Sequence, residues 1–361
     1  MSKQFLKEYL NAYSPVAQET EGQNVWINYV KQFTNNVNLD AYGTAYAILK
    51  GSQPNLSHRL GEPYKVVLEA HCDEIAWIVS YIEKDGFVRV KTHGGSDNMI
   101  APSKTVMVHT HNGTKVPGLF GSPAIHVREK RTEMGSEVHE LWLDLGVDSD
   151  EKVKELGIEV GNVVTFDTQF SELGDYYVGR SLDNKIGGYI IAETLRNLEN
   201  VKLPFDLYVV NSVQEEVGLY GARMIAKKLQ ADIALVHDVC HNTNHPKMNK
   251  SKDGDIKGGE GPCLEYTAQN HRKIINKFKE VANHSEIPLQ NTIGSYGNDT
   301  MSFFLENTPT AILASPLKYM HTTVEMVHKK DVENAITLFT NVLTSITPEW
   351  IESVINPKIS I

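Results

Sequence analysis

The chain has 361 residues, which is too long for one compact core and suggests about two domains. Apolar residues make up 41% and charged residues 22% of the chain, ordinary globular values that exclude a disordered or fibrous protein. With 35 Lys and Arg against 45 Asp and Glu, the formal net charge of -10 argues against a general nucleic-acid-binding protein, which would carry a basic face.

The cysteine content and the hydropathy indicate a cellular location. Three cysteines without regular spacing form no disulfide framework and suit a reducing compartment. The first residues contain no apolar signal region, and no apolar run approaches the ~20 residues that span a bilayer. We therefore expect a cytoplasmic protein that binds neither nucleic acid nor a membrane.

The first third of the chain predicts helices followed by a buried strand. Residues 5–33 repeat apolar side chains at helical spacing, and Ser14-Pro15 interrupts the pattern, so we predict two amphipathic helices rather than one. Residues 65–70, KVVLEA, have the composition of a strand that is buried on both faces.

From residue 75 to about 172 the chain consists mostly of short β-like runs separated by turn signals. The dipeptides Asp85-Gly86 and Asn112-Gly113 favour tight hairpins. Residues 140–145 and 162–170 predict two further strands, and residues 149–156 predict a helix. This segment therefore predicts a small β-rich domain inserted at 75–172.

After residue 177 the pattern alternates between helix and strand, which is typical of a mainly parallel sheet. Helices are expected at 181–198, 218–229, 271–283 and 331–346, and strands at 204–213, 232–236 and 310–315. The predicted fold class is α/β, with a mainly parallel sheet flanked by helices. Residues 1–74 and 173–361 would form this catalytic domain, and the β-rich domain at 75–172 would interrupt it.

Metal-binding types of side chain follow four of the predicted strands. In chain order they are His71, Asp73, Glu215, Glu216, Asp238 and His321, and Asp183 stands in the first turn expected after Ser181. Ligands of open α/β sheets bind at the carboxyl ends of the strands, so we expect these residues to meet at one edge. Histidine nitrogens with carboxylate oxygens favour Zn²⁺, Co²⁺ or Mn²⁺. A pair of such ions with a spare carboxylate suits hydrolysis.

The same motifs resemble a known family. HCDE at 71–74, GRSLDNK at 179–185, QEEVGLYGA at 214–222, HDV at 237–239, GND at 297–299 and SPLKYMHTTVE at 315–325 are similar to the tetrahedral (glutamyl or deblocking) aminopeptidases. These are dinuclear metallopeptidases that are often called endoglucanases. Residues 124–130 and 141–162 also resemble the inserted domain of this family, so the likeness covers nearly the whole chain.

The resemblance implies a set of metal ligands and a cofactor. Two divalent ions per chain, zinc first and cobalt or manganese as alternatives, would be bound by His71, Asp183, Glu216, Asp238 and His321. Asp183 would bridge the two ions. His71 and Asp238 would serve one ion, and Glu216 and His321 the other, a division that the sequence leaves open.

The resemblance also implies the catalytic roles, the substrate class and the assembly. Glu215 would be the general base that takes a proton from the attacking water and passes it to the leaving amine. Asp73 would orient His71 from behind the metal site. Such enzymes remove N-terminal residues from short peptides, and they commonly assemble through the inserted domain into dimers and tetrahedral dodecamers.

The chain departs from the family pattern in several places, one of which is SPVAQE at 14–19, where Ser-Gly-x-Glu is common. Asn184, Lys185 and Lys318 stand where Asp, Arg and Arg are usual. These changes spare the proposed ligands and the base, so we expect them to affect the substrate pocket and the surroundings of the metal site. Lys318 could favour acidic N-terminal side chains, or it could form a structural ion pair.

Several other histidines, cysteines and lysines have simpler explanations than a role in the metal site. His237, His241 and His245 are assigned to a polar loop, Cys72 and Cys240 to buried packing, and the Lys-rich segment 247–257 to solvated surface. Two further functions stay open. One is a dinuclear deacylase acting on N-acyl amino acids, which would not require a free α-amine. The other is a non-catalytic assembly protein on the same scaffold.

Overall fold

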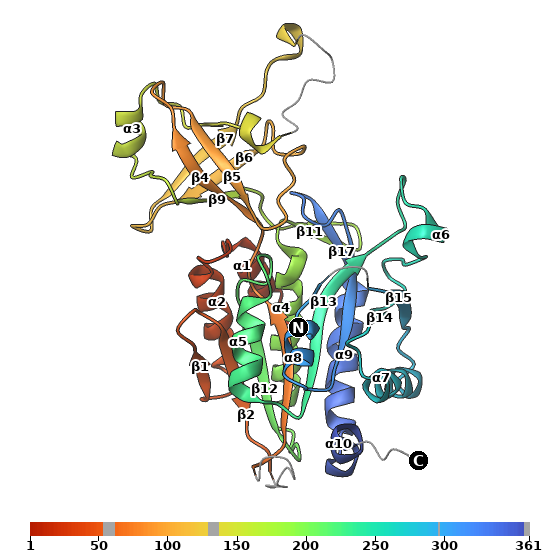
Figure 1. The fold of residues 1–361 in the computed structure, drawn as a ribbon. Helices are drawn as coiled ribbons and strands as arrows, with labels where there is room; N and C mark the ends of the chain where they lie inside the picture. The colour runs from red at the N-terminus through yellow and green to blue at the C-terminus, as the bar shows by residue number, and fades with distance from the viewer. Residues whose placement is uncertain (53–61, 129–136, 295–296, 357–361) are drawn as a thin grey trace.

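The computed structural model describes residues 1–52, 62–128, 137–294 and 297–356. It contains a large sheet covered by helices and a small closed barrel that lies beyond one end of the sheet (Figure 1). The predicted α/β fold class with an additional β-rich unit is confirmed. Residues 129–130, the end of one segment that carries the family resemblance, lie outside the described residues.

Four parallel strands form the centre of the sheet. In spatial order they are β12 (Asp206–Ser212), β3 (Lys65–His71), β13 (Ile233–His241) and β16 (Thr310–Lys318). Along β3, Val66 and Leu68 pack into one hydrophobic core and Val67 into another, as expected of a strand that is covered on both faces. Ser212 pairs with His71, so the carboxyl ends of β12 and β3 lie at the same edge.

Shorter strands extend the sheet, mostly with antiparallel pairing. They are β1 (Val37–Leu39), β2 (Ala45–Leu49), β10 (Ser171–Leu173), β11 (Tyr176–Gly179), β14 (Cys263–Tyr266), β15 (Gln290–Ile293) and β17 (Glu325–His328). The strand β14 pairs with both β16 and β15. These strands have too few residues for a clear period-2 pattern, and they were not predicted.

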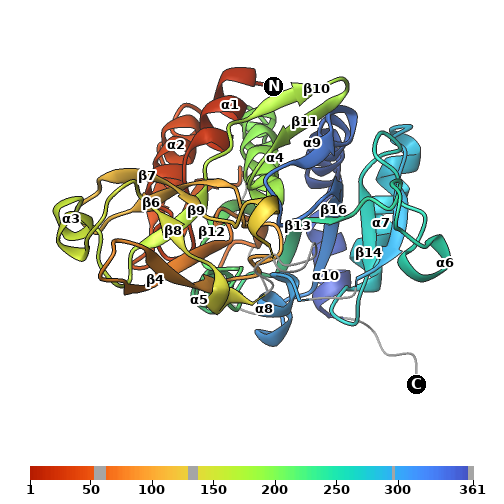
Figure 2. The same ribbon diagram turned by 90° about the horizontal axis from the view of Figure 1, so that it is seen from above.

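Helices cover both faces of the sheet. One face carries α1 (Lys3–Asn11), α2 (Thr20–Val30), α4 (Leu182–Leu198), α7 (Arg272–His284), α9 (Lys329–Ser345) and α10 (Pro348–Ile355), and the other carries α5 (Tyr220–Leu229) and α8 (Thr300–Leu305). Figure 2 shows α1, α2, α4 and α9 on the side of the sheet opposite to α5 and α8. The six helices predicted for this part of the chain are confirmed, with small shifts at their ends. No helix in the described ranges is long and apolar enough to cross a bilayer.

The β-rich segment forms a closed antiparallel barrel in the order β4-β5-β8-β7-β6-β9. Its strands are β4 (Ala76–Ile82), β5 (Val88–His93), β6 (Thr105–His109), β7 (Lys115–Phe120), β8 (Leu143–Asp144) and β9 (Val163–Phe166). The turns predicted at Gly86 and Gly113 are present, and both glycines have positive φ angles. Trp77 fills the barrel, with its ring centroid 5.0 Å from that of Phe120 and 4.8 Å from that of Phe166.

The barrel also corrects part of the sequence prediction. The sequence predicts one strand over 140–145, but the 3₁₀ helix η2 (Val138–Glu140) includes the first of these residues, and β8 contains only Leu143–Asp144. A second 3₁₀ helix, η1 (Ile125–Val127), also lies in this segment, and the predicted helix is present as α3 (Asp150–Glu155). The division of the chain into domains at 75 and 172 stays a prediction.

A buried charge cluster joins the end of β3 to the start of α4. Glu74 contacts Arg180 Nη1 and lies 3.3 Å from Lys185 Nζ, and all three side chains are almost fully buried. Burial would raise the pKa of Glu74, but the two cations lower it to about 2, so the carboxylate is ionised. Lys185 also donates a hydrogen bond to the Ala12 carbonyl oxygen. Lys185 therefore belongs to the buried surroundings of the site rather than to a pocket wall, because its ammonium group is fully buried in this cluster.

Candidate metal centre

The predicted site residues lie at the carboxyl-terminal edge of the four central strands. They are His71 at the end of β3, Asp73 just beyond it, Glu215 and Glu216 after β12, Asp238 within β13, His321 after β16, and Asp183 at the start of α4. The structure thus brings together all seven side chains, which come from distant parts of the chain. The parallel pairing of the strands explains why they meet.

One group of donor atoms surrounds His71 Nε2. This nitrogen lies 3.4 Å from Asp183 Oδ1, 3.8 Å from Glu215 Oε2 and 3.8 Å from Asp238 Oδ1. The donor atoms of His71, Glu215 and Asp238 all lie within 4.8 Å of one another, which makes them a candidate metal-binding group.

A second group of donor atoms surrounds His321 Nε2. This nitrogen lies 3.2 Å from Asp183 Oδ2 and 3.3 Å from Glu216 Oε1. The donor atoms of these three residues again lie within 4.8 Å of one another. Asp183 therefore faces His71 with one carboxylate oxygen and His321 with the other, and it is the side chain that connects the two groups.

Asp73 holds the backbone that carries the two glutamates. Its carboxylate accepts one hydrogen bond from the backbone N–H of Glu215 and one from that of Glu216, each 3.0 Å long. Its Oδ1 also lies 3.5 Å from His71 Nδ1, which is beyond the usual length of a hydrogen bond. The direct contacts of Asp73 thus fix the position of the Glu215-Glu216 pair, and its role in orienting His71 stays a prediction.

Several residues of the site have left-handed backbone conformations that side chains other than glycine rarely adopt. The φ angle is 57° at Gln214, 61° at His321 and 55° at Ser181. Ser181 was expected to cap a helix that begins before Asp183, but it makes no capping hydrogen bond, and Asp183 and Asn184 have non-helical angles. Asp183 lies in the first turn of α4 as expected, but this turn is distorted, and regular helical angles begin only after Asn184.

Glu325 is a buried residue of the site that the sequence analysis missed. Its carboxylate accepts a hydrogen bond of 2.7 Å from the His321 backbone N–H and one of 3.1 Å from the Asp183 backbone N–H. It therefore links the backbones of two candidate ligands. A glutamate just before the apolar pair Met326-Val327, four residues after a candidate histidine, is the signal that the sequence offers.

The charges of the site require compensation by cations. Burial would lower the pKa of His321, but Asp183 and Glu216 raise it to about 12, and burial together with other carboxyl groups raises the pKa of Glu215 and Asp238. Carboxyl groups outnumber imidazole rings here, and uncompensated charge is costly in a buried position. Two groups of nitrogen and oxygen donors, joined by one carboxylate, fit a pair of divalent metal ions.

A cavity of about 380 Å³ gives access to these side chains. Val239, His241, Gly297 and Met320 complete its lining. His241, which the sequence assigns to a polar loop, is instead the last residue of β13 and lines the cavity. His237 was assigned to the same loop, but it is a fully buried strand residue whose Nε2 lies 2.9 Å from Ser315 Oγ. Cys72 and Cys240 are buried free thiols, as predicted.

Comparisons with known proteins agree with this arrangement. The family model described as M42 glutamyl aminopeptidase matches residues 55–338. The putative aminopeptidase FrvX of Escherichia coli K12 is 30% identical over 361 residues, covering 98% of each chain. The structure of the aminopeptidase APDkam598 from Desulfurococcus kamchatkensis superposes with a TM-score of 0.89 at 29% identity, covering 99% of each chain. The Pyrococcus horikoshii TET1 peptidase, which can assemble into a tetrahedron or a large octahedral shell, superposes with a TM-score of 0.83 at 26% identity, covering 95% of this chain and 99% of that one.

Proposed function

The chain belongs to the M42 glutamyl aminopeptidase family, and from this premise we propose that it is a metal-dependent aminopeptidase acting on short peptides. The observation that carries the proposal is the pair of donor groups that Asp183 joins beside an open cavity. Such a site suits hydrolysis of an unactivated amide, because bound metal ions can activate the attacking water and polarise the carbonyl.

We infer that the site holds two ions, with zinc as the best match to imidazole and carboxylate donors and cobalt or manganese as alternatives. His71, Asp238, Glu216 and His321 would be terminal ligands, and Asp183 would bridge. When bound, the two ions would polarise the scissile carbonyl and acidify the attacking water. The contacts of Asp183 with both histidines support the bridging role.

Glu215 is the proposed general base. Its carboxylate lines the cavity, and its backbone is fixed by Asp73, so the group is both accessible to substrate and held in place. It would accept the proton of the attacking water and deliver it to the nitrogen of the leaving peptide, which breaks the amide bond without releasing an amide anion. Glu216, held by the same Asp73 carboxylate, points to His321 and takes the ligand role.

A requirement for a free α-amine tests the substrate class. We expect aminoacyl-p-nitroanilides to be hydrolysed by the zinc- or cobalt-loaded enzyme, and their N-acetyl derivatives to be hydrolysed at least ~100-fold more slowly. Preferential hydrolysis of N-acyl amino acids would favour a deacylase instead. Less than one ion per chain, together with no activity on either class, would favour a non-catalytic assembly protein.

We propose that the chain forms homo-oligomers through the barrel, either dimers or dodecamers built from dimers. The barrel exposes apolar side chains near η1, with Ile125 63% and Val127 73% accessible, as an association surface would. We expect Val127→Glu to shift the protein to a smaller species in size-exclusion chromatography with light scattering. Val201→Glu, at an exposed apolar position before β12, is the control and should leave the mass unchanged. A cytoplasmic location stays a prediction.

A further inference from the structure

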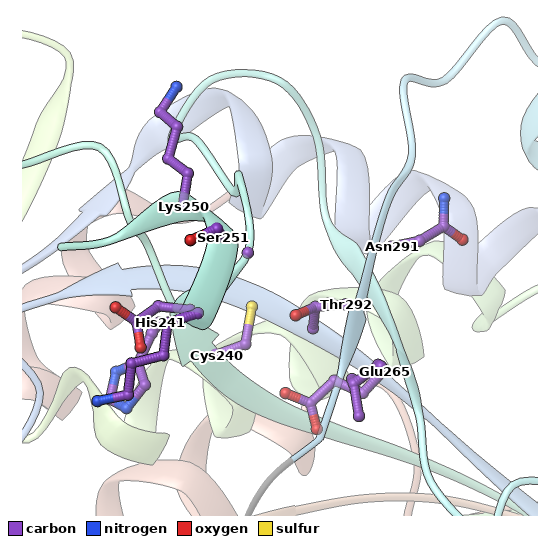
Figure 3. Close-up of a pocket in the computed structure, with 11 residues that line it drawn as sticks. Cys240, His241, Lys250, Ser251, Glu265, Asn291 and Thr292 are labelled. Atoms are coloured by element: carbon purple, nitrogen blue, oxygen red, sulfur yellow. The ribbon is translucent and has the colours of Figure 1, made fainter.

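A second and larger cavity adjoins the metal site. It measures about 640 Å³, and His241 lines both this cavity and the one that holds the candidate metal ligands. Its walls come from the end of β13, the short helix α6 (Lys250–Asp253), and the strands β14 and β15 (Figure 3). The Lys-rich segment, expected to be plain solvated surface, therefore forms one wall of a pocket next to the reaction centre.

Glu265 is a buried acid in the wall of this cavity. The residue is only 2% exposed, and among the described residues none forms a hydrogen bond or an ion pair with its side-chain carboxyl group. Figure 3 shows this carboxyl group directed toward Cys240 and His241, into the space between the strands and α6. Buried carboxyl groups are normally paired, so one that faces a cavity without a partner suggests that a ligand supplies the partner.

The sheet register relates Glu265 to the metal site. In β16, Ala314 pairs with Asp238 on one side and with Cys263 on the other, so these residues share one face of the sheet. Glu265 lies two residues beyond Cys263, and therefore on the same face. Asp238 and Cys263 lie on opposite sides of Ala314, about 10 Å apart, and Glu265 lies about 7 Å further along β14, so roughly 12 Å separates the backbones of Asp238 and Glu265. The side chain of Glu265 and an extended lysine or arginine side chain can together span a separation of this size.

The other charged groups around the cavity already have partners or are exposed. Lys250 Nζ lies 2.8 Å from Asp255 Oδ1, and Asp253 accepts a hydrogen bond of 2.9 Å from the Asn249 backbone N–H. Lys318, which could have attracted an acidic substrate, lines neither of the two cavities, and its Nζ lies 5.1 Å from the centroid of the Tyr176 ring. The charge left to be matched in this pocket is therefore negative.

We propose that Glu265 selects peptides whose N-terminal residue is lysine or arginine, by receiving the cationic end of that side chain in the second cavity. The inference rests on the proposed aminopeptidase function and names its substrate class. An acidic side chain would meet a like charge, and an uncharged one would leave Glu265 unpaired. A charge-assisted hydrogen bond with an ammonium or guanidinium group avoids the like-charge repulsion and also provides the buried carboxylate with a partner.

The test compares kcat/KM for lysyl-, norleucyl- and glutamyl-p-nitroanilide, because norleucine has nearly the shape of lysine without its charge. We expect the wild-type enzyme to prefer lysine over norleucine by at least ~10-fold. Glu265→Gln should reduce kcat/KM for lysine by about 10- to 100-fold and leave norleucine within about twofold. The matched control is Asp253→Asn, which removes a negative charge from the same cavity and should change the ratio by less than about threefold.

The pH dependence of the ratio gives a readout that a merely structural role would not change. Burial raises the pKa of Glu265 to about 7, so the group becomes ionised as the pH rises through that value. The lysine-to-norleucine ratio should therefore increase between about pH 6 and 8 in the wild type and stay flat in Glu265→Gln. The other titratable groups at this cavity are Cys240, His241, Lys250, Lys252, Asp253 and Cys263. They are common to both proteins, so the comparison isolates Glu265.

Two outcomes would overturn the proposal. One is an active enzyme that hydrolyses norleucyl or glutamyl substrates as well as lysyl ones. The other is a Glu265→Gln variant of normal metal content and thermal midpoint in which kcat/KM falls equally for all three substrates. Inactivity of the wild type on every aminoacyl substrate would instead contradict the proposed aminopeptidase function, so the two failures are distinguishable.

Discussion

Replacing Glu215 by glutamine is expected to lower kcat by about 10²–10⁴ without changing the metal content of the protein. The amide retains the size of the carboxylate but cannot accept the proton of the attacking water. Because the backbone of Glu215 is held by Asp73, the substitution should leave the loop in place. Steady-state kinetics on an aminoacyl-p-nitroanilide, with metal analysis of the same sample, measures both effects.

The neighbouring glutamate provides a matched comparison. Glu216→Gln removes the same charge one residue away, on a side chain that contacts His321, and it should lower metal affinity as well as activity. The two variants have to be compared because Glu215 Oε2 lies only 3.8 Å from His71 Nε2, so Glu215 could itself bind a metal ion. Loss of metal in Glu215→Gln would make Glu215 a ligand, and unchanged turnover would exclude it as the base.

The parts of the fold that the sequence predicted correctly are those with long, locally encoded patterns. Residues 65–70 are mostly apolar and have the composition of a strand that is buried on both faces, so the segment identifies a central strand and places His71 at its end. The Asn-Gly and Asp-Gly dipeptides encode hairpin turns by their preference for positive φ angles. Residues that follow such strands could be assigned to one edge, because parallel pairing fixes where the strand ends meet.

What the sequence could not predict depends on contacts between distant segments. The left-handed backbone of Gln214 and His321 is stable only because residues such as Asp73 and Glu325 bind the neighbouring N–H groups. Lys185 resembled a pocket residue by its position in a motif, and only its ion pair with Glu74, more than one hundred residues away, shows that it is structural. The proposed role of Glu265 could not be predicted from the sequence. That role depends on the absence of a hydrogen-bond or ion-pair partner for its carboxyl group among the described residues, which no local sequence pattern indicates.

Asp183→Asn is expected to have the other large effect, because Asp183 contacts both groups of donor atoms. Its oxygens lie 3.4 Å from His71 Nε2 and 3.2 Å from His321 Nε2, so the substitution weakens two sites at once. Removing an outer partner of a metal ligand typically costs 10- to 100-fold in metal affinity, and loss of a shared ligand should cost more. We expect kcat/KM to fall by at least ~100-fold at limiting zinc.

Thermal unfolding with and without zinc distinguishes loss of metal from loss of chemistry. An ion that binds only the folded state stabilises it by about 2.7 kcal/mol at one hundred times its Kd, so the wild type should show a clear rise in Tm when zinc is added. The rise should be much smaller in Asp183→Asn. Asp238→Asn, which alters only the group around His71, should retain part of it. An equal zinc-induced rise in wild type and Asp183→Asn would show that Asp183 is no metal ligand, and the bridge between the two groups would then have to be another residue.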